Sequence, residues 1–107
     1  MITVIDPGPP GHATFFVSLL PTRADWPADM TASEQAALSG HAQHLSDNAD
    51  SGRCVIAGPC LDAQLGIAVW DGLQLDELVA ELRANDPMVM SGFFDATVRA
   101  MRLSFER

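Results

Sequence analysis

Two residues of this chain have the side chains that acid–base chemistry needs, a histidine at position 41 and an aspartate at position 86. A histidine ring can accept a proton near neutral pH and return it within one reaction cycle. A carboxylate beside the ring favours the protonated imidazole and fixes which nitrogen carries the proton. If the fold brings His41 and Asp86 together, they form a proton-transfer pair suited to isomerisation or elimination.

Each of these residues also has a plain structural interpretation. His41 lies at the edge of an apolar helical stripe, where a histidine can simply pack with its ring nitrogens satisfied. Asp86 precedes Pro87, and an Asp-Pro pair is typical of the start of a helical turn that the carboxylate caps. The two roles of Asp86 are compatible, because one oxygen can cap while the other accepts from an imidazole. His44 lies further toward solvent, and we expect it on the surface.

The sequence gives little support to other kinds of site. His41, His44 and Asp47 share a helix, but no HExxH pattern is present, so we expect no metal and no cofactor. No serine lies in a GxSxG motif, and no glycine-rich phosphate loop precedes a helix. Cys54 and Cys60 are expected on one strand, about 20 Å apart. That separation is too long for a disulfide, so both are expected to be reduced, buried side chains.

Length and charge limit the class of protein. The chain has 107 residues and a net charge of −8, from 14 acidic and 6 basic side chains. One domain is expected, and the acidic excess argues against nucleic acid and anionic membranes as partners. No segment approaches the roughly 20 apolar residues of a membrane span, and residues 1–11 lack the pattern of a signal peptide. We therefore expect a cytoplasmic homodimer that binds a small molecule.

The hydrophobic pattern predicts the order strand, helix, strand, strand, helix, strand. Residues 1–12 are interpreted as an N-terminal tail or a short added strand, ahead of one domain at 13–107. The strand that contains Cys54 is apolar on both faces and is expected to be covered on both sides. We expect strands at 13–20, 53–60, 64–71 and 95–105, and helices at 31–49, after Gly72, and over a short turn that begins at Asp86 and ends near Gly92.

The first helix has the clearest boundaries. Thr31 and Glu34 have the spacing of a capping box, and Gly52 supplies the stop. An apolar stripe at 4-3-4 spacing is expected to form its buried face; it consists of Leu38, Ala42, Leu45 and Ala49. The simplest fold for this order of elements is a ferredoxin-like βαββαβ α+β fold, with a four-stranded antiparallel sheet and two helices on one face.

The spacing of several motifs resembles that of the YCII-related family of small α+β proteins. The match covers residues 14–105, although Met88 stands where the family has an aromatic residue. The resemblance implies a ferredoxin-like fold that pairs through its sheets as a dimeric α+β barrel. It also implies a pocket centred on a histidine and an aspartate, here His41 and Asp86. The matching motifs are His41, Gly52-Arg53, Ala57-Gly58-Pro59, Asp86-Pro87 with Gly92, and the loop Trp26–Thr31.

Three hypotheses follow for the function. The first is a small lyase or isomerase in which His41 and Asp86 are catalytic and act on a lactone or a hydroxylated aromatic molecule. Arg53, or the backbone around Gly58 and Pro59, would then bind substrate and hold a developing oxyanion. The second is a non-catalytic ligand-binding or regulatory module with the same pocket. The third is a structural dimer without a pocket, in which the histidine packs and the aspartate only caps.

Overall fold

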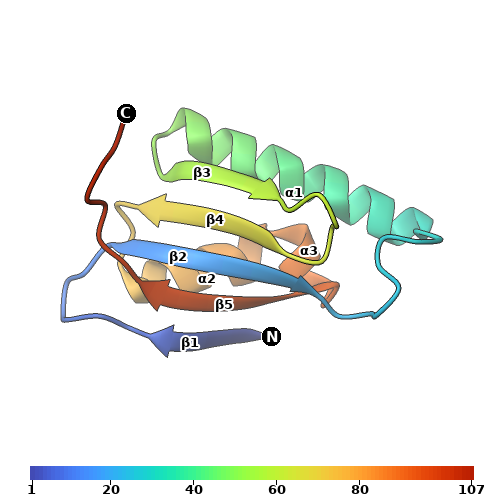
Figure 1. Ribbon diagram of the computed structural model, residues 1–107, viewed down its shortest axis with the longest axis horizontal. Helices are drawn as coiled ribbons and strands as arrows, with labels where there is room; N and C mark the ends of the chain where they lie inside the picture. The colour runs from blue at the N-terminus through green and yellow to red at the C-terminus, as the bar shows by residue number, and fades with distance from the viewer.

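One mixed sheet of five strands forms the centre of the molecule, and its helices lie on one face (Figure 1). The computed structural model describes residues 1–107. The order across the sheet is β1-β5-β2-β4-β3, with β1 parallel to β5 and the other neighbours antiparallel. The strands are β1 (Ile2–Asp6), β2 (Thr14–Pro21), β3 (Cys54–Pro59), β4 (Gly66–Asp71) and β5 (Phe94–Ala100), and the helices are α1 (Ala32–Asp50), α2 (Leu75–Asn85) and α3 (Pro87–Met90).

This sheet differs from the predicted one of four antiparallel strands under two helices. The N-terminal residues are not all tail, because β1 adds a fifth, parallel strand at the edge of β5. Ile2 pairs with Ala96 and packs against the core, while the rest of β1 is exposed. A five-residue edge strand with one half-buried side chain carries little of the alternating pattern by which strands are recognised. The alternative of a short added strand describes β1.

The core lies between the helices and one face of the sheet. Alternate residues of β2 and β5 point to this face, and they are almost fully buried. On β2 these are Phe15, Val17 and Leu19, whose exposed fractions are 0%, 0% and 4%. Leu78 and Leu82 of α2 pack against them from the helical layer. The opposite face of the sheet carries no helix (Figure 1).

The prediction that β3 is covered on both sides is wrong. β3 is the edge strand next to β4, and Ile56 keeps 56% of its surface exposed. Cys54 is buried but Cys60, just beyond the strand, is exposed, so only one of the two is a buried side chain; both are free thiols. Burial raises the pKa of the Cys54 thiol, which makes it a poor nucleophile. At the other end of the chain, β5 stops at Ala100, short of the predicted boundary.

Helix α1 begins as predicted but buries a different face. Its capping box is complete, and the residues of the predicted apolar stripe are half-buried or exposed. Three of the stripe's four residues, Leu38, Ala42 and Leu45, line a cavity instead, because the neighbouring polar face turns inward. Buried polar groups need hydrogen-bond partners. His41 and His44 of this face bond to the carboxylates of Asp86 and Glu81, which lie on the segment from α2 to α3. The buried residues of α1 are Glu34, Ala37, His41, His44 and Asn48.

None of the three helices combines the length and the apolar character that crossing a lipid bilayer requires.

Candidate functional site

His41 and Asp86, which are 45 residues apart in the chain, form a buried pair. The Nδ1 atom of His41 lies 2.9 Å from each oxygen of the Asp86 carboxylate. The exposed fractions of the two residues are 8% and 1%. A carboxylate only accepts hydrogen bonds, so Nδ1 carries the proton and donates it. In the neutral ring Nε2 is therefore the unprotonated nitrogen, and it makes no hydrogen bond within the protein.

The chain around Asp86 fixes the carboxylate in place. Asp86 ends α2 and caps α3, and its Oδ1 accepts a hydrogen bond of 3.1 Å from the backbone N–H of Met88. Pro87 occupies the first position of α3, where its missing N–H costs nothing. The capping role and the contact with His41 are thus both present, as the sequence allowed. Met88 itself is fully buried in the core and does not line the cavity.

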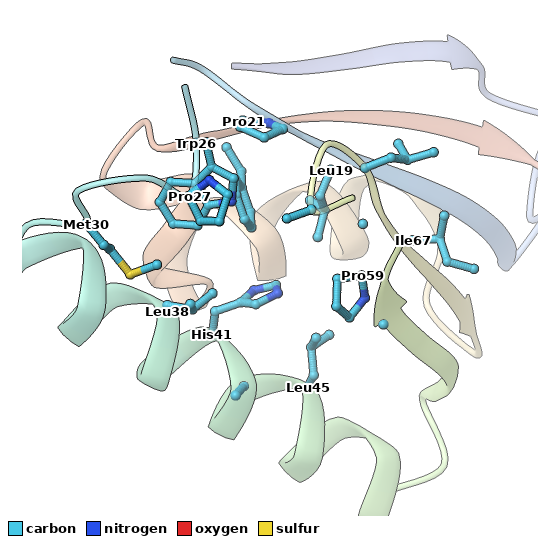
Figure 2. A pocket seen from close by; sticks show the side chains of 16 residues that line it. Leu19, Pro21, Trp26, Pro27, Met30, Leu38, His41, Leu45, Pro59 and Ile67 are labelled. Carbon is cyan, nitrogen blue, oxygen red and sulfur yellow. The ribbon is translucent and has the colours of Figure 1, made fainter. Parts of the chain in front are cut away.

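The His41 ring opens onto a cavity of about 440 Å³. Figure 2 shows the ring pointing from α1 toward the middle of the lining residues. Helix α1, the ends of β2 to β5, the loop after β2 and the β3–β4 turn together form the wall. His41 is the only ionisable side chain in this wall. The remaining lining residues are Leu19, Pro21, Trp26, Pro27, Met30, Leu38, Ala42, Leu45, Gly58, Pro59, Ala63, Leu65, Gly66, Ile67 and Phe94.

The cavity contains some of the residues predicted to bind substrate but not all of them. Gly58 and Pro59, at the end of β3, lie in the wall. Arg53 does not line the cavity, because it precedes β3, at the far end of that strand, and its Nε donates to the Ser51 hydroxyl at 3.3 Å. Phe94 meets the His41 ring edge to face, with 5.7 Å between the ring centres. The hypothesis without a pocket is wrong, since the pair is in direct contact beside a cavity.

Neither a scan against protein-family models nor a search of curated proteins finds a match to this chain.

A second histidine–carboxylate pair lies three residues further along α1. The prediction that His44 lies on the surface is wrong, because only 8% of it is exposed and its Nε2 lies 2.9 Å from Glu81 Oε1. Burial raises the pKa of the Glu81 carboxyl, but hydrogen bonds from His44 and Asn85 outweigh this effect and leave the pKa lowered. The hydrogen bond to Glu81 offsets part of the free-energy cost of burying the His44 ring. No sequence pattern had indicated that these two residues pair. His44 does not line the cavity.

A partly buried ion pair holds the loop that carries Trp26, one wall of the cavity. Arg23 donates to both oxygens of Glu34, at 2.8 and 3.2 Å, and its guanidinium lies over the Trp26 ring, 5.3 Å from the centre. A further hydrogen bond joins Arg23 to Asp25 at 2.8 Å. The loop is tied from the other side as well, since the Gln64 side chain donates to the Trp26 carbonyl at 2.6 Å. These contacts make Arg23 and Glu34 positioning residues for the cavity wall.

The Arg23–Glu34 pair predicts a specific pH dependence of stability. Arg23 lowers the pKa of the Glu34 carboxyl below its ordinary value of 4.5, chiefly through their hydrogen bonds. A lowered folded-state pKa means that the charged carboxylate stabilises the fold above that ordinary value. This contribution is lost as the pH falls through the folded-state value. We expect the difference in unfolding free energy between wild type and Glu34→Gln to be largest near pH 6.5 and to shrink toward pH 3. Urea unfolding at both pH values measures it, and a difference that grows toward acid pH would contradict this assignment.

Gly40, which no sequence pattern singled out, lets α1 approach the segment that carries Asp86. A Cβ atom at Gly40 would lie 2.8 Å from the ring Cγ of Pro87, closer than carbon atoms pack. Alanine normally favours a helix over glycine by about 1 kcal/mol, but here it would press on the residue next to the carboxylate. We expect Gly40→Ala to destabilise the protein by about 1–2 kcal/mol and to weaken the hydrogen bonds between His41 and Asp86.

A double-mutant cycle with Pro87→Ala checks this contact. The second change removes the ring atoms that the new methyl group would meet, so the two substitutions together should cost less than their sum. The measurement is the unfolding free energy of the four proteins in urea. Strict additivity would show that Gly40 does not set the spacing between α1 and α3.

Proposed function

We propose that this chain is a small acid–base enzyme of the lyase or isomerase class, with His41 and Asp86 as its catalytic pair. The observation that carries the proposal is the position of the pair: Nδ1 of His41 donates to both carboxylate oxygens at 2.9 Å, and the ring lines an apolar cavity. Asp86 lies behind the ring and outside the cavity wall, so it orients His41 while Nε2 faces the ligand.

The chemistry follows from this arrangement. Nε2 of His41 takes a proton from carbon or from a hydroxyl group of the substrate, and the resulting imidazolium is stabilised by the adjacent carboxylate. The same ring returns the proton elsewhere on the substrate or to a leaving group. Isomerisation of a lactone, or elimination of HX from a hydroxylated ring, requires no more than one such group. No cofactor is needed for either reaction.

We further propose the ferredoxin-like, YCII-related assignment and a cytoplasmic homodimer of the dimeric α+β barrel type. Supporting the fold is the order β-α-β-β-α-β from β2 onward, once the four-residue α3 is counted with α2 as one helical segment. Supporting the dimer is the sheet face without helices, where Phe16 is half-buried and Leu20 and Ile56 keep 42% and 56% of their surfaces exposed. Light scattering on the purified protein tests the dimer, and a monomer at micromolar concentration would contradict it.

The test of the catalytic proposal is a turnover screen with a matched inactive protein. Uncharged lactones and halogenated hydroxylated aromatic molecules are incubated with wild type and with His41→Ala, and proton NMR follows both products and exchange of carbon-bound hydrogen with D₂O. We expect at least one compound to react with wild type and to react about 10²- to 10⁴-fold more slowly with His41→Ala. Equal rates with the two proteins would contradict the assignment.

A ligand-binding module remains the second candidate, because one specific observation favours it. The wall offers a single ionisable side chain, so no second charged side chain is placed to stabilise an oxyanion. In such a module a small molecule raises the melting temperature of wild type more than that of His41→Ala, and no product or hydrogen exchange is detected.

A further inference from the structure

We infer that the cavity selects uncharged, largely apolar molecules with one hydrogen-bonding group, and that it rejects carboxylates and phosphates. This inference rests on the proposed function only in taking the cavity beside His41 as the ligand site. It narrows the substrate class, because an acid–base pair alone is equally compatible with charged and uncharged molecules. Three features of the cavity support it: the absence of a cation, the charge of the pair and the shape of the wall.

No cation is available to an anionic ligand. The chain has no lysine, and none of its six arginines lines the cavity. Arg23, the arginine next to the Trp26 wall, is held by Glu34 and Asp25 and lies over the Trp26 ring. Arg53 bonds to Ser51 outside the cavity. An anion that entered would lose its water without gaining an ion pair, which is strongly unfavourable in an apolar site.

The His41–Asp86 pair does not supply the missing positive charge. With a neutral imidazole the pair carries a charge of −1 from the Asp86 carboxylate, and with an imidazolium its net charge is zero. In neither state does it attract an anion over the length of the cavity, and the whole chain carries −8. Nε2 still offers one strong hydrogen bond, so a hydroxyl or carbonyl group of an uncharged ligand finds a partner there.

The shape of the wall indicates the size and form of the ligand. About 440 Å³ is the space of roughly 15 water molecules at 30 Å³ each. Rigid ring side chains from three elements face this space. Trp26 and Pro27 come from the loop after β2 and Pro59 from β3 (Figure 2), and Phe94 of β5 also lines it. The apolar stripe of α1, which the fold leaves outside the core, adds Leu38 and Leu45 as the floor. A one- or two-ring molecule with a polar group at one end matches this space.

Two probes that differ in charge test the inference. Binding of 2-naphthol, uncharged at pH 7, and of 2-naphthoate is measured by isothermal titration calorimetry on the full chain. Nitrogen NMR of His41 reports whether the probe reaches the cavity. We expect 2-naphthol to bind and to shift the Nε2 resonance, and 2-naphthoate to bind at least about tenfold more weakly. Naphthoate binding as tight as naphthol binding, failure of naphthol to bind up to millimolar concentration, or naphthol binding that leaves Nε2 unmoved would each overturn the inference.

A pair of variants tests the physical cause of the selectivity. Ala42 is an exposed residue of α1 that lines the cavity, so its replacement does not disturb the core. Ala42→Arg places a cation at the rim and should strengthen naphthoate binding about tenfold, whereas Ala42→Gln adds a side chain of related length without charge and should not. No gain with Ala42→Arg would contradict the explanation by charge.

These measurements separate this inference from the catalytic proposal. If the expected selectivity is observed but no compound is turned over, the inference about ligand charge is supported and the proposal of an enzyme is rejected. Turnover of an anionic substrate that depends on His41 does the reverse, since it supports the enzyme and overturns the selectivity.

Discussion

Replacing Asp86 with asparagine is expected to lower kcat/KM by about 10³- to 10⁴-fold, the size of effect seen when the carboxylate behind a catalytic histidine is neutralised. The amide oxygen can still accept from the Met88 N–H and cap α3. The amide NH₂ then occupies the position of the second oxygen, 2.9 Å from Nδ1 of His41, and donates to it. A proton on Nδ1 would then lie against this NH₂ and keep only the capping oxygen as its acceptor, so the tautomer with the proton on Nε2 is favoured and the ring becomes a poor base toward the cavity. Steady-state kinetics on a substrate from the turnover screen measures the loss.

The second histidine–carboxylate pair provides the matched control. Glu81→Gln makes the same chemical change beside His44, which does not line the cavity. We expect this variant to keep kcat/KM within a few-fold of wild type, as changes that spare the reacting groups do. Equal losses in both variants would show that the effect comes from the docking of α1. Full activity of Asp86→Asn would show that Asp86 only caps α3.

Removing the Asp86 side chain should have the largest effect on stability. Asp86→Ala leaves the Nδ1–H of His41 buried without an acceptor and takes the cap from α3. An unsatisfied buried donor costs about 1–3 kcal/mol and a lost N-cap about 0.5–2 kcal/mol, so we expect a loss of about 2–4 kcal/mol of unfolding free energy. The isosteric Asp86→Asn keeps a cap and a hydrogen bond, so it should cost about 1 kcal/mol.

Urea unfolding at pH 7 separates the two variants, with the midpoint and the slope read together so that stability is distinguished from changes in the unfolded chain. A similar, small cost for Asp86→Ala and Asp86→Asn would mean that water reaches the carboxylate. The pair would then contribute no more than a surface contact.

The parts of the fold set by local chemistry were predictable from the sequence. The Thr31–Glu34 capping box starts α1, and Asp86-Pro87 starts α3, because both depend on side chains that bond to backbone groups a few residues away. The contact between His41 and Asp86 was a hypothesis that residue types and spacing suggested, and the geometry brings the two side chains together. The strands expected at 13–20 and 64–71 likewise correspond to β2 and β4.

The rest depended on tertiary contacts that periodicity does not encode. Leu38, Ala42, Leu45 and Ala49 were predicted as the buried face of α1. The buried face instead includes His41 and His44, which bond to carboxylates 45 and 37 residues away, and this amounts to a rotation of the helix about its axis. A helical-wheel analysis counts histidine as polar and therefore predicts that His44 is exposed to solvent. The same rotation explains why an apolar stripe is available to a ligand. Arg53 does not line the cavity either, because the opposite end of β3, at Gly58 and Pro59, faces it. The sequence pattern does not indicate which end of the strand lies beside the cavity.

The most direct test of the catalytic arrangement is the tautomer of His41, read from long-range nitrogen–proton NMR correlations of the ring. The structure predicts that the neutral imidazole carries its proton on Nδ1, facing Asp86, with Nε2 unprotonated toward the cavity. In Asp86→Asn the proton should move to Nε2. A wild-type ring protonated mainly on Nε2, or a tautomer that is unchanged in Asp86→Asn, would contradict the proposal that Asp86 prepares His41 to act as a base.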